Sequence, residues 1–297
     1  MLRNFQELRT AAKGRGTVRV AVAAAQDREV MEAIQAGVQA GLIEAVLVGD
    51  KSLIAPWVKE LELGGKVETV HEADLGRASL LAAGLVRDGE AQVLMKGLVN
   101  SSVFLRAALD PERGLRSGRL LSHLAVLETP GRKKLEFYTD GGMNIAPGLE
   151  EKRSILGNAL AALGRMGIAT PKVAVLCANE QVSPKMPATV DAQALVQDWQ
   201  AGAFPSCVVE GPIALDVAIS PEAARHKNLQ SQVSGDVDIF LVPNIEAGNL
   251  VTKGMVYYAQ AKFAGVILGA THPMVMVSRS DPAEAKFNAV AMAALLA

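Results

Sequence analysis

The feature that most constrains the fold is a regular alternation of short apolar runs with amphipathic segments of helical period. The run Thr17–Ala25 is rich in Val and Ala, and the segment after it repeats apolar residues at helical spacing. Further short apolar runs follow at Ala45–Gly49, Val67–His71 and Ala91–Lys96. Such runs, separated by helices, are typical of βαβ units and a mainly parallel sheet. The sequence therefore predicts an α/β fold.

A change in this pattern marks the passage into a second domain. Ser122–Glu128 and Lys134–Thr139 are strand-like runs joined by a turn at Pro130-Gly131, which indicates antiparallel or edge strands. The last helix, predicted over Asp281–Ala297, is apolar enough to pack back onto the first domain. We therefore expect two α/β/α domains with an active-site cleft between them. Their expected bounds are 1–130 plus 272–297 for the first domain and 131–271 for the second.

The stretch 236–284 holds the strongest candidate site. A strand predicted at its start is followed by Asn249 and Lys253, and a later apolar run ends directly before Ser278 and Arg279. Asp281 is then expected to be the N-cap of the last helix, with Pro282 in its first position. Free N–H groups at a helix start favour anions, and an arginine adds a bidentate fork. The pattern predicts a phosphate site at Ser278-Arg279.

A second candidate anion site of the same type lies in the first half of the chain. The run Ala91–Lys96 ends in a basic residue, and Asn100 and Ser101 follow just before a predicted helix. Asn144 stands in a further polar loop, after Asp140. In α/β proteins ligands bind at the carboxyl ends of strands, so we expect substrate contacts from these positions. The expected substrate-binding residues are Lys96, Asn100, Ser101, Asn144, Asn249 and Lys253.

Several classes of function are excluded or disfavoured. The net charge is −1 and no long basic block occurs, which disfavours nucleic-acid binding. Neither a P-loop nor a G-x-G-x-x-G sequence follows a predicted strand, which disfavours a P-loop nucleotide site and a standard dinucleotide-binding fold. The histidines lack metal-ligand spacing, although His123 and His272 fall near strand ends and stay open as site residues. Cys177 and Cys207 lie in apolar runs, as buried core thiols do.

The sequence also gives an expectation about where in the cell the protein is found. No run approaches the roughly 20 apolar residues that a membrane span requires. The first eleven residues are amphipathic and charged, without the apolar centre of a signal peptide. We expect a soluble, cytoplasmic protein.

Several motifs in order along the chain are similar to one known family. VLMKGLVNSSVFLRAAL, GLRSGRLLSHLAVLETPG, FYTDGGMNIAPGLEEK, PNIEAGNLVTKG and VSRSDPAEAK resemble the phosphate acetyl/butyryl transferases, most nearly their phosphate butyryltransferase branch. The resemblance implies two α/β/α domains like those of isocitrate and isopropylmalate dehydrogenases, and a homodimer formed through the second domain. It implies that acyl-CoA and phosphate give acyl phosphate and CoA, without a metal or bound cofactor.

The resemblance also assigns site residues. The family's Ser-Arg pair, which binds the phosphate-bearing substrate, matches Ser278-Arg279. The family's catalytic Asp has Asp281 as its nearest counterpart here and Glu284 as its second. The reaction needs a base for the CoA thiol, a cation for the phosphoryl group and donors for the carbonyl oxyanion. Asp281, Arg279 and Ser278 suit these three tasks, and no acyl-enzyme is required.

Other functions stay open at the level of the sequence. A phosphate acetyltransferase, or another acyltransferase that uses acyl phosphates, would share these motifs. A two-domain dehydrogenase is weaker because paired metal-binding carboxylates are missing from the predicted helices. A non-enzymatic sensor of acyl-CoA or phosphate is the alternative from another class of protein.

Overall fold

The computed structural model describes residues 2–278 and 280–297, and these divide into two compact units. The central unit is Leu120–Lys262. The terminal unit combines Leu2–Arg119 with Phe263–Ala297. The boundaries expected from the sequence, at 130/131 and 271/272, lie further along the chain.

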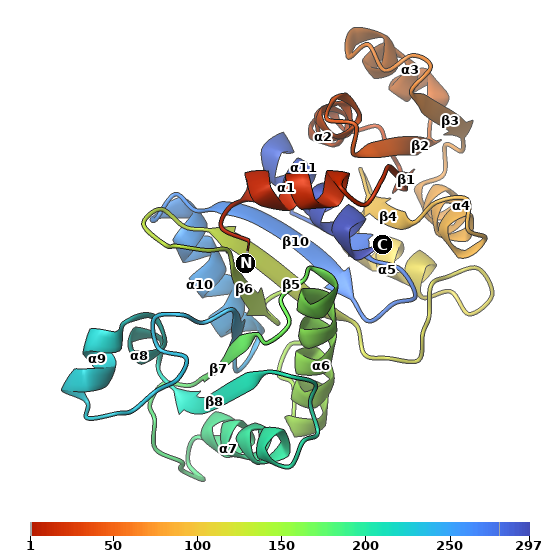
Figure 1. Ribbon diagram of the computed structural model, residues 1–297. Helices are drawn as coiled ribbons and strands as arrows, with labels where there is room; N and C mark the ends of the chain where they lie inside the picture. Colours follow the sequence, from red (N-terminus) through yellow and green to blue (C-terminus); the bar gives the residue numbers. More distant parts are fainter. Residues whose placement is uncertain (1, 279) are drawn as a thin grey trace. The chain divides into compact units, whose positions relative to one another are not determined.

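The terminal unit is built on a mainly parallel set of strands in the order β3-β2-β1-β4-β11-β10. Figure 1 labels all of them except β11. All neighbours are parallel except β10 and β11, which are antiparallel. The elements are α1 (Phe5–Lys13), β1 (Val18–Ala23), α2 (Arg28–Gln39), β2 (Ile43–Gly49), α3 (Lys51–Glu60), β3 (Val67–His71), α4 (Leu75–Arg87), β4 (Val93–Lys96), α5 (Ser101–Ala108), β10 (Lys262–Leu268), β11 (Met274–Val275) and α11 (Ala283–Leu296).

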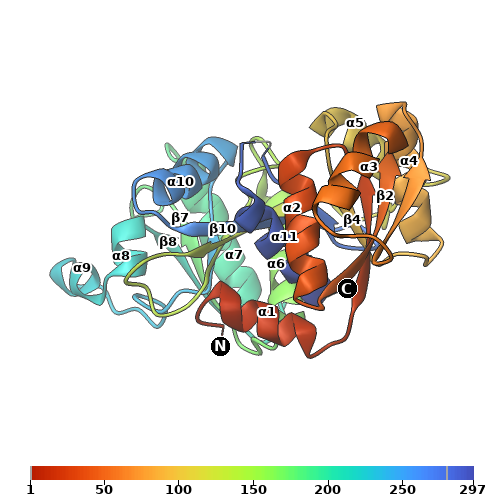
Figure 2. The same ribbon diagram turned by 90° about the horizontal axis from the view of Figure 1, so that it is seen from above.

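Burial explains the sequence pattern of this unit. Every residue of β1 from Val20 onward is buried, as the apolar run predicted for a strand covered on both faces. Helix α11 is buried from Ala285 to Leu296 and packs against α1 and α2 (Figure 2). Its many alanines let the neighbouring helices approach closely. The expectation that the last helix returns to the N-terminal part of the chain is confirmed.

The central unit has the strand order β5-β6-β9-β7-β8. β5 and β6 form the antiparallel pair that the sequence predicted, and β6, β9, β7 and β8 are parallel. Helices α6 and α10 lie on opposite faces of the β5–β6 pair (Figure 1). The elements are β5 (Ser122–Glu128), β6 (Glu136–Thr139), α6 (Leu149–Arg165), β7 (Lys172–Leu176), α7 (Pro187–Gln200), β8 (Val208–Ile213), α8 (Leu215–Ile219), α9 (Pro221–His226), β9 (Ile239–Leu241) and α10 (Ile245–Tyr257).

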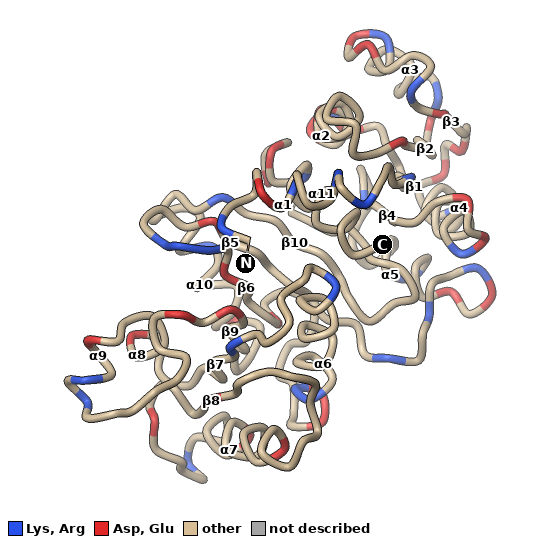
Figure 3. Tube along the Cα trace, in the orientation of Figure 1, with Lys and Arg blue, Asp and Glu red and all other residues tan. Residues whose placement is uncertain are grey.

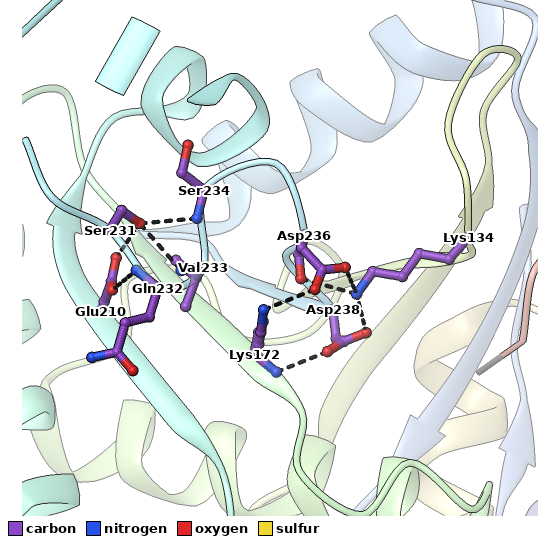
Figure 4. Close-up of polar contacts among 9 residues, drawn as sticks. All are labelled: Lys134, Lys172, Glu210, Ser231, Gln232, Val233, Ser234, Asp236 and Asp238. Atoms are coloured by element: carbon purple, nitrogen blue, oxygen red, sulfur yellow. Dashed lines mark hydrogen bonds and ion pairs between the residues drawn. The ribbon is translucent and has the colours of Figure 1, made fainter. Parts of the chain in front are cut away.

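An ionic cluster joins the amino-terminal ends of β6, β7 and β9 (Figure 4). Lys134 Nζ lies 2.6 Å from Asp238 Oδ1 and 2.9 Å from Asp236 Oδ1. Lys172 Nζ lies 2.8 Å from Asp236 Oδ2, and its backbone N–H donates to Asp238 Oδ2. Ligands of α/β units bind at the opposite, carboxyl edge. The cluster therefore serves the structure by holding three strand ends together.

The prediction of an α/β fold with mainly parallel strands is confirmed. Among the helices of the described residues, none has the length and apolar character that a membrane crossing requires.

Candidate active site

The carboxyl edge of the terminal unit brings several of the predicted residues to one place. β11 is the parallel neighbour of β4, with Val275 paired to Met95. Met276 is therefore level with Lys96, and Ser278 lies just past the end of β4. The two candidate sites, at Lys96 and at Ser278, are far apart in the sequence but share one sheet edge because β4 and β11 are adjacent.

Helix capping distinguishes this part of the edge from the rest. Helices α2, α3 and α4 each begin with an aspartate whose carboxylate accepts a first-turn N–H; these caps are Asp27, Asp50 and Asp74. Helices α5 and α11, which follow β4 and β11, have no side-chain cap among the described residues. The positive dipole ends of these two helices are therefore not met by a capping side chain, which favours an anion there. The two uncapped helices follow the two neighbouring strands.

The loop after β4 is shaped by a close approach to β1. The N–H groups of Gly97 and Leu98 donate to the carbonyls of Ala23 and Ala24, at 2.8 and 2.7 Å. A Cβ atom at Gly97 would lie 2.1 Å from the Ala24 carbonyl oxygen, so glycine is required here. Lys96 Nζ donates to the Gly97 and Val99 carbonyls, at 3.3 and 3.1 Å. These contacts hold the Lys96 ammonium beside the loop that leads into α5.

The turn before α11 differs from the sequence expectation. The Asp281 carboxylate does not cap α11; its Oδ2 accepts the Ser278 N–H at 2.8 Å, and the Asp281 N–H donates back to the Ser278 carbonyl at 3.1 Å. The N-cap is Pro282, and the helix begins one residue later than its expected first position, at Ala283. The Asp281 carboxylate accepts the Ser278 N–H instead of an N–H in the first turn of α11. Arg279, the expected phosphate ligand, lies outside the described residues.

Hydroxyl groups complete this turn. Ser278 Oγ lies 3.0 Å from Ser280 Oγ, and both residues are exposed. Asn100 and Ser101, at the start of α5 in the connection that follows β4, are exposed as well. The edge therefore presents hydroxyl, amide and backbone N–H donors, which suit a phosphate group.

In the central unit, Asn144 has a structural task that sequence reasoning missed. Its two amide hydrogens go to the Leu121 carbonyl at 2.9 Å and to Asp140 Oδ2 at 2.6 Å. Asp140 is 1% exposed and also accepts the backbone N–H groups of His123, Gly142, Met143 and Asn144. Asn144 thus ties the loop after β6 to the start of β5, and its Oδ1 is what remains for a ligand. The short Asp-Gly-Gly sequence was the available signal, since glycines let backbone N–H groups turn toward a carboxylate.

Asn249 and Lys253 lie four residues apart on an exposed side of α10. The start of α10 is unlike that of α5. Asn244 caps it by accepting the Ala247 N–H at 2.9 Å, and the Ile145 carbonyl accepts the Ile245 N–H at 3.0 Å. The exposed side chains of Asn249 and Lys253, rather than the helix start, are what this element offers to a ligand.

The strand directions decide where each of the two histidines that the sequence left open lies within its own unit. His272 follows β10, which runs antiparallel to β11, so the loop with His272 lies at the amino edge, opposite to Ser278. His123 is the second residue of β5 and lies beside the carboxyl end of β6. Its ring packs on Gly142, where a Cβ atom would lie 2.9 Å from the ring's Cγ. His272 is thereby removed from the carboxyl edge of the terminal unit.

Basic residues also occur in the connection between α5 and β5 (Figure 3). Arg113 and Arg116 are exposed there. Leu115 lies between these two arginines, and its carbonyl accepts the Thr271 N–H at 2.9 Å. Ser117, the residue after Arg116, donates its hydroxyl to the Gly269 carbonyl. Gly269 and Thr271 belong to the amino-edge loop, so these arginines are held at that edge as well.

The thiols are poor nucleophiles. Burial raises the pKa of Cys177 to about 11 and also raises the pKa of Cys207. At neutral pH both are protonated, and the thiolate is the reactive form. In addition, residues 2–278 and 280–297 bring together no group of three His, Cys, Asp or Glu side chains able to hold a metal ion. The chemistry available at the described edge is therefore that of hydroxyls, a carboxylate, an ammonium and backbone N–H groups.

Comparisons with known proteins agree on one family. The family model for phosphate acetyl/butaryl transferase matches residues 57–294. The chain is 43% identical over 300 residues to a phosphate butyryltransferase of Clostridium acetobutylicum, covering all of this chain and 99% of that protein. It is 38% identical to a phosphate acetyltransferase of Thermotoga maritima, covering 99% of both chains.

A solved structure supports the same assignment. The crystal structure of a branched-chain phosphotransacylase from Enterococcus faecalis V583 superposes with a TM-score of 0.83 at 32% identity, covering 94% of this chain and 99% of that one. Both the sequence along the whole chain and the fold therefore match acyltransferases. The chain belongs to the phosphate acetyl/butyryl transferase family.

Proposed function

We propose that this protein transfers a short-chain acyl group, of about butyryl size, between coenzyme A and inorganic phosphate. The observation that carries the proposal is the edge at β4 and β11, where two helices begin without side-chain caps beside Lys96 and Ser278. Such an edge suits a phosphate dianion. The 43% identical relative is a phosphate butyryltransferase, which supports the butyryl group as substrate.

The proposed reaction is a direct attack without an acyl-enzyme. A phosphate oxygen attacks the thioester carbonyl carbon, a C–O bond forms, the C–S bond breaks, and the CoA thiolate leaves and takes up a proton. In the reverse direction the Asp281 carboxylate accepts the thiol proton while the thiolate attacks the acyl phosphate. Its Oδ2 is bound to the Ser278 N–H, which leaves Oδ1 for this step. The Ser278 hydroxyl and the α11 N–H groups stabilise the carbonyl oxyanion.

The remaining site residues have binding tasks in this proposal. Arg279 holds two phosphate oxygens through its fork, so Arg279→Lys loses activity along with Arg279→Ala. We expect Arg279→Ala to lower kcat/KM by a factor on the order of 10²–10³. Lys96, Asn100 and Ser101 are substrate-binding residues of the terminal unit in this proposal. Asn144, Asn249 and Lys253 are proposed substrate-binding residues of the central unit. Coenzyme A and phosphate enter as substrates, with no resident cofactor or metal.

Cellular and oligomeric features complete the proposal. We expect a cytoplasmic homodimer of two-domain chains related to isocitrate and isopropylmalate dehydrogenases. Leu250 and Tyr257, seven residues apart on α10 of the central unit, are 72% and 68% exposed, and Tyr258 is 93% exposed. Large exposed apolar side chains on one helix are typical of a subunit interface. Light scattering should give twice the mass of one chain, and the mass of a single chain would refute the dimer.

The decisive experiment is release of free thiol from butyryl-CoA. Purified protein should release CoA when phosphate is present, and EDTA should leave the rate unchanged. Release without phosphate would identify a thioesterase, and no release would contradict the proposal. Because a pocket discriminates by about 1–3 kcal/mol per methylene, kcat/KM for butyryl-CoA should exceed that for acetyl-CoA by more than about tenfold. A ratio below one would identify a phosphate acetyltransferase instead.

A further inference from the structure

Lys286, in the first turns of α11, is a buried lysine with an unusual set of neighbours. Its side chain donates to the backbone carbonyl of Asp281, and the residue is 3% exposed. Within residues 2–278 and 280–297 it forms no ion pair. The other two buried lysines, both in the central unit, do: Lys152 Nζ lies 2.6 Å from Asp191 Oδ2, and Lys134 Nζ lies 2.6 Å from Asp238 Oδ1.

The position of Lys286 is electrostatically unfavourable in the protein alone. A buried ammonium without a counter-charge loses its hydration and gains little in return. The first turn of a helix carries the positive end of the helix dipole, which disfavours a nearby cation. Helix α11 also has no side-chain cap, and the acidic residue of its first turn, Glu284, forms an ion pair with Arg9 at 3.7 Å. These features would all become favourable if an anion bound at the start of α11.

Hydrogen bonds connect Lys286 to the turn where that anion is expected. Lys286 holds the Asp281 carbonyl, Asp281 Oδ2 holds the Ser278 N–H, and the Ser278 carbonyl accepts the Asp281 N–H. The Lys286 ammonium has three N–H groups, and one of them donates to the Asp281 carbonyl. Lys286 therefore contacts the turn at a buried position, through the Asp281 carbonyl, whereas Ser278 is exposed.

We propose that Lys286 is a positioning residue for the phosphate group, and that bound phosphate is its missing counter-charge. This inference rests on the proposed function, because it assumes that phosphate binds at the Ser278 turn. Lys286 fixes the turn through Asp281 and supplies a positive charge beneath it. The buried charge is retained because phosphate binding needs it, although the unliganded protein would be equally or more stable without it.

The test uses two variants that separate charge from hydrogen bonding. Lys286→Met keeps the length and removes both the charge and the donor. Lys286→Gln keeps a donor for the Asp281 carbonyl and removes the charge. Both should raise the KM for phosphate at least about tenfold, the scale of a lost hydrogen bond to a charged group, with a change in the KM for butyryl-CoA of less than about threefold.

Thermal melts give a second readout that is independent of turnover. Phosphate should raise the melting temperature of the wild type through binding linkage, and this rise should be much smaller in both variants. Without phosphate, Lys286→Met should melt at or above the wild-type temperature. The matched control is Lys152→Met, which leaves the Asp191 carboxylate unpaired and should lower the melting temperature while leaving the KM for phosphate unchanged.

The outcomes are distinct. If Lys286→Gln keeps the wild-type KM for phosphate and the wild-type phosphate-dependent melt, Lys286 is a hydrogen-bond donor alone and the proposal is wrong. If Lys286→Met does not fold, Lys286→Gln decides by the same two readouts. If the wild type releases no CoA with phosphate, the proposed function fails. The phosphate-dependent melts of wild type and Lys286→Gln then still decide whether Lys286 serves an anion site.

Discussion

Gly97→Ala should damage both stability and activity, because the added methyl group would enter the contact between β1 and the loop after β4. The new Cβ would lie 2.1 Å from the Ala24 carbonyl oxygen and 2.7 Å from that of Ala23, and both atoms are backbone. The first distance must open to at least 3.0 Å, and no side-chain rotation can achieve this. The loop therefore has to move away from β1.

The magnitude follows from what that movement breaks. The hydrogen bonds from Gly97 and Leu98 to β1 contribute about 1 kcal/mol each, so losing both costs about 2 kcal/mol. Overpacking strain adds about 1–3 kcal/mol. The free energy of unfolding should fall by about 3–5 kcal/mol, which lowers the melting temperature by roughly 6 °C or more. The loop carries Lys96 and leads to Asn100, so kcat/KM should fall as well.

The matched control is Gly84→Ala in α4 of the same unit. Nothing lies within 4 Å of a Cβ atom at Gly84, and alanine is favoured over glycine inside a helix by about 0.5–1 kcal/mol. Thermal melts and the thiol-release assay should therefore show a stable, active Gly84→Ala protein. If Gly97→Ala melts within about 2 °C of the wild type and keeps its kcat/KM, the loop after β4 does not lie in close contact with the end of β1, and the reasoning is refuted.

Three further predictions concern single side chains. Asp281→Asn should melt at the wild-type temperature, since its amide oxygen can still accept the Ser278 N–H. If the carboxylate is the base, kcat of this variant should fall by about 10²-fold or more. A wild-type kcat would show that Asp281 is not the base. Lys172 and Lys134 lower the pKa of Asp236 below its usual value, so the stability from this carboxylate is present above about pH 4 and lost as pH falls through the lowered pKa. Asp236→Asn should therefore narrow the gap in melting temperature between neutral and acid pH, and an unchanged gap would count against the linkage. Cys177→Ser should retain phosphate-dependent CoA release, because the buried thiol takes no part in the reaction, and loss of activity in a folded variant would reopen an acyl-enzyme mechanism.

Much of the fold could be predicted because it depends on local patterns. Apolar runs predicted β1, β2, β3 and β4, and apolar residues at helical spacing predicted the helices between them. The turn signal at Pro130-Gly131 predicted the β5–β6 pair. These features are decided by a residue and its near neighbours in the chain. Propensity, periodicity and capping act over this range.

Part of the candidate site was also visible locally. Ser278 was expected between the end of a strand and the start of a helix. Lys96 was expected as the last residue of another strand, with Asn100 in the loop after it. Sequence reasoning treated them as two sites of the same type. The pairing of β11 with β4 brings them to one edge. That pairing joins segments far apart in the chain and leaves no local signature.

The roles of individual side chains depended on the tertiary structure most of all. His272 falls at the amino edge because β10 runs antiparallel to β11, and Asn144 gives its amide hydrogens to Leu121 and Asp140. The sequence alone singled out nothing at Lys286, whose burial and lack of an ion pair within the described residues are properties of the tertiary structure. A residue's type and spacing predict what it is able to bind. Its actual partner depends on burial and on which distant segment packs against it, because the cost of an unpaired polar group arises only once water is excluded.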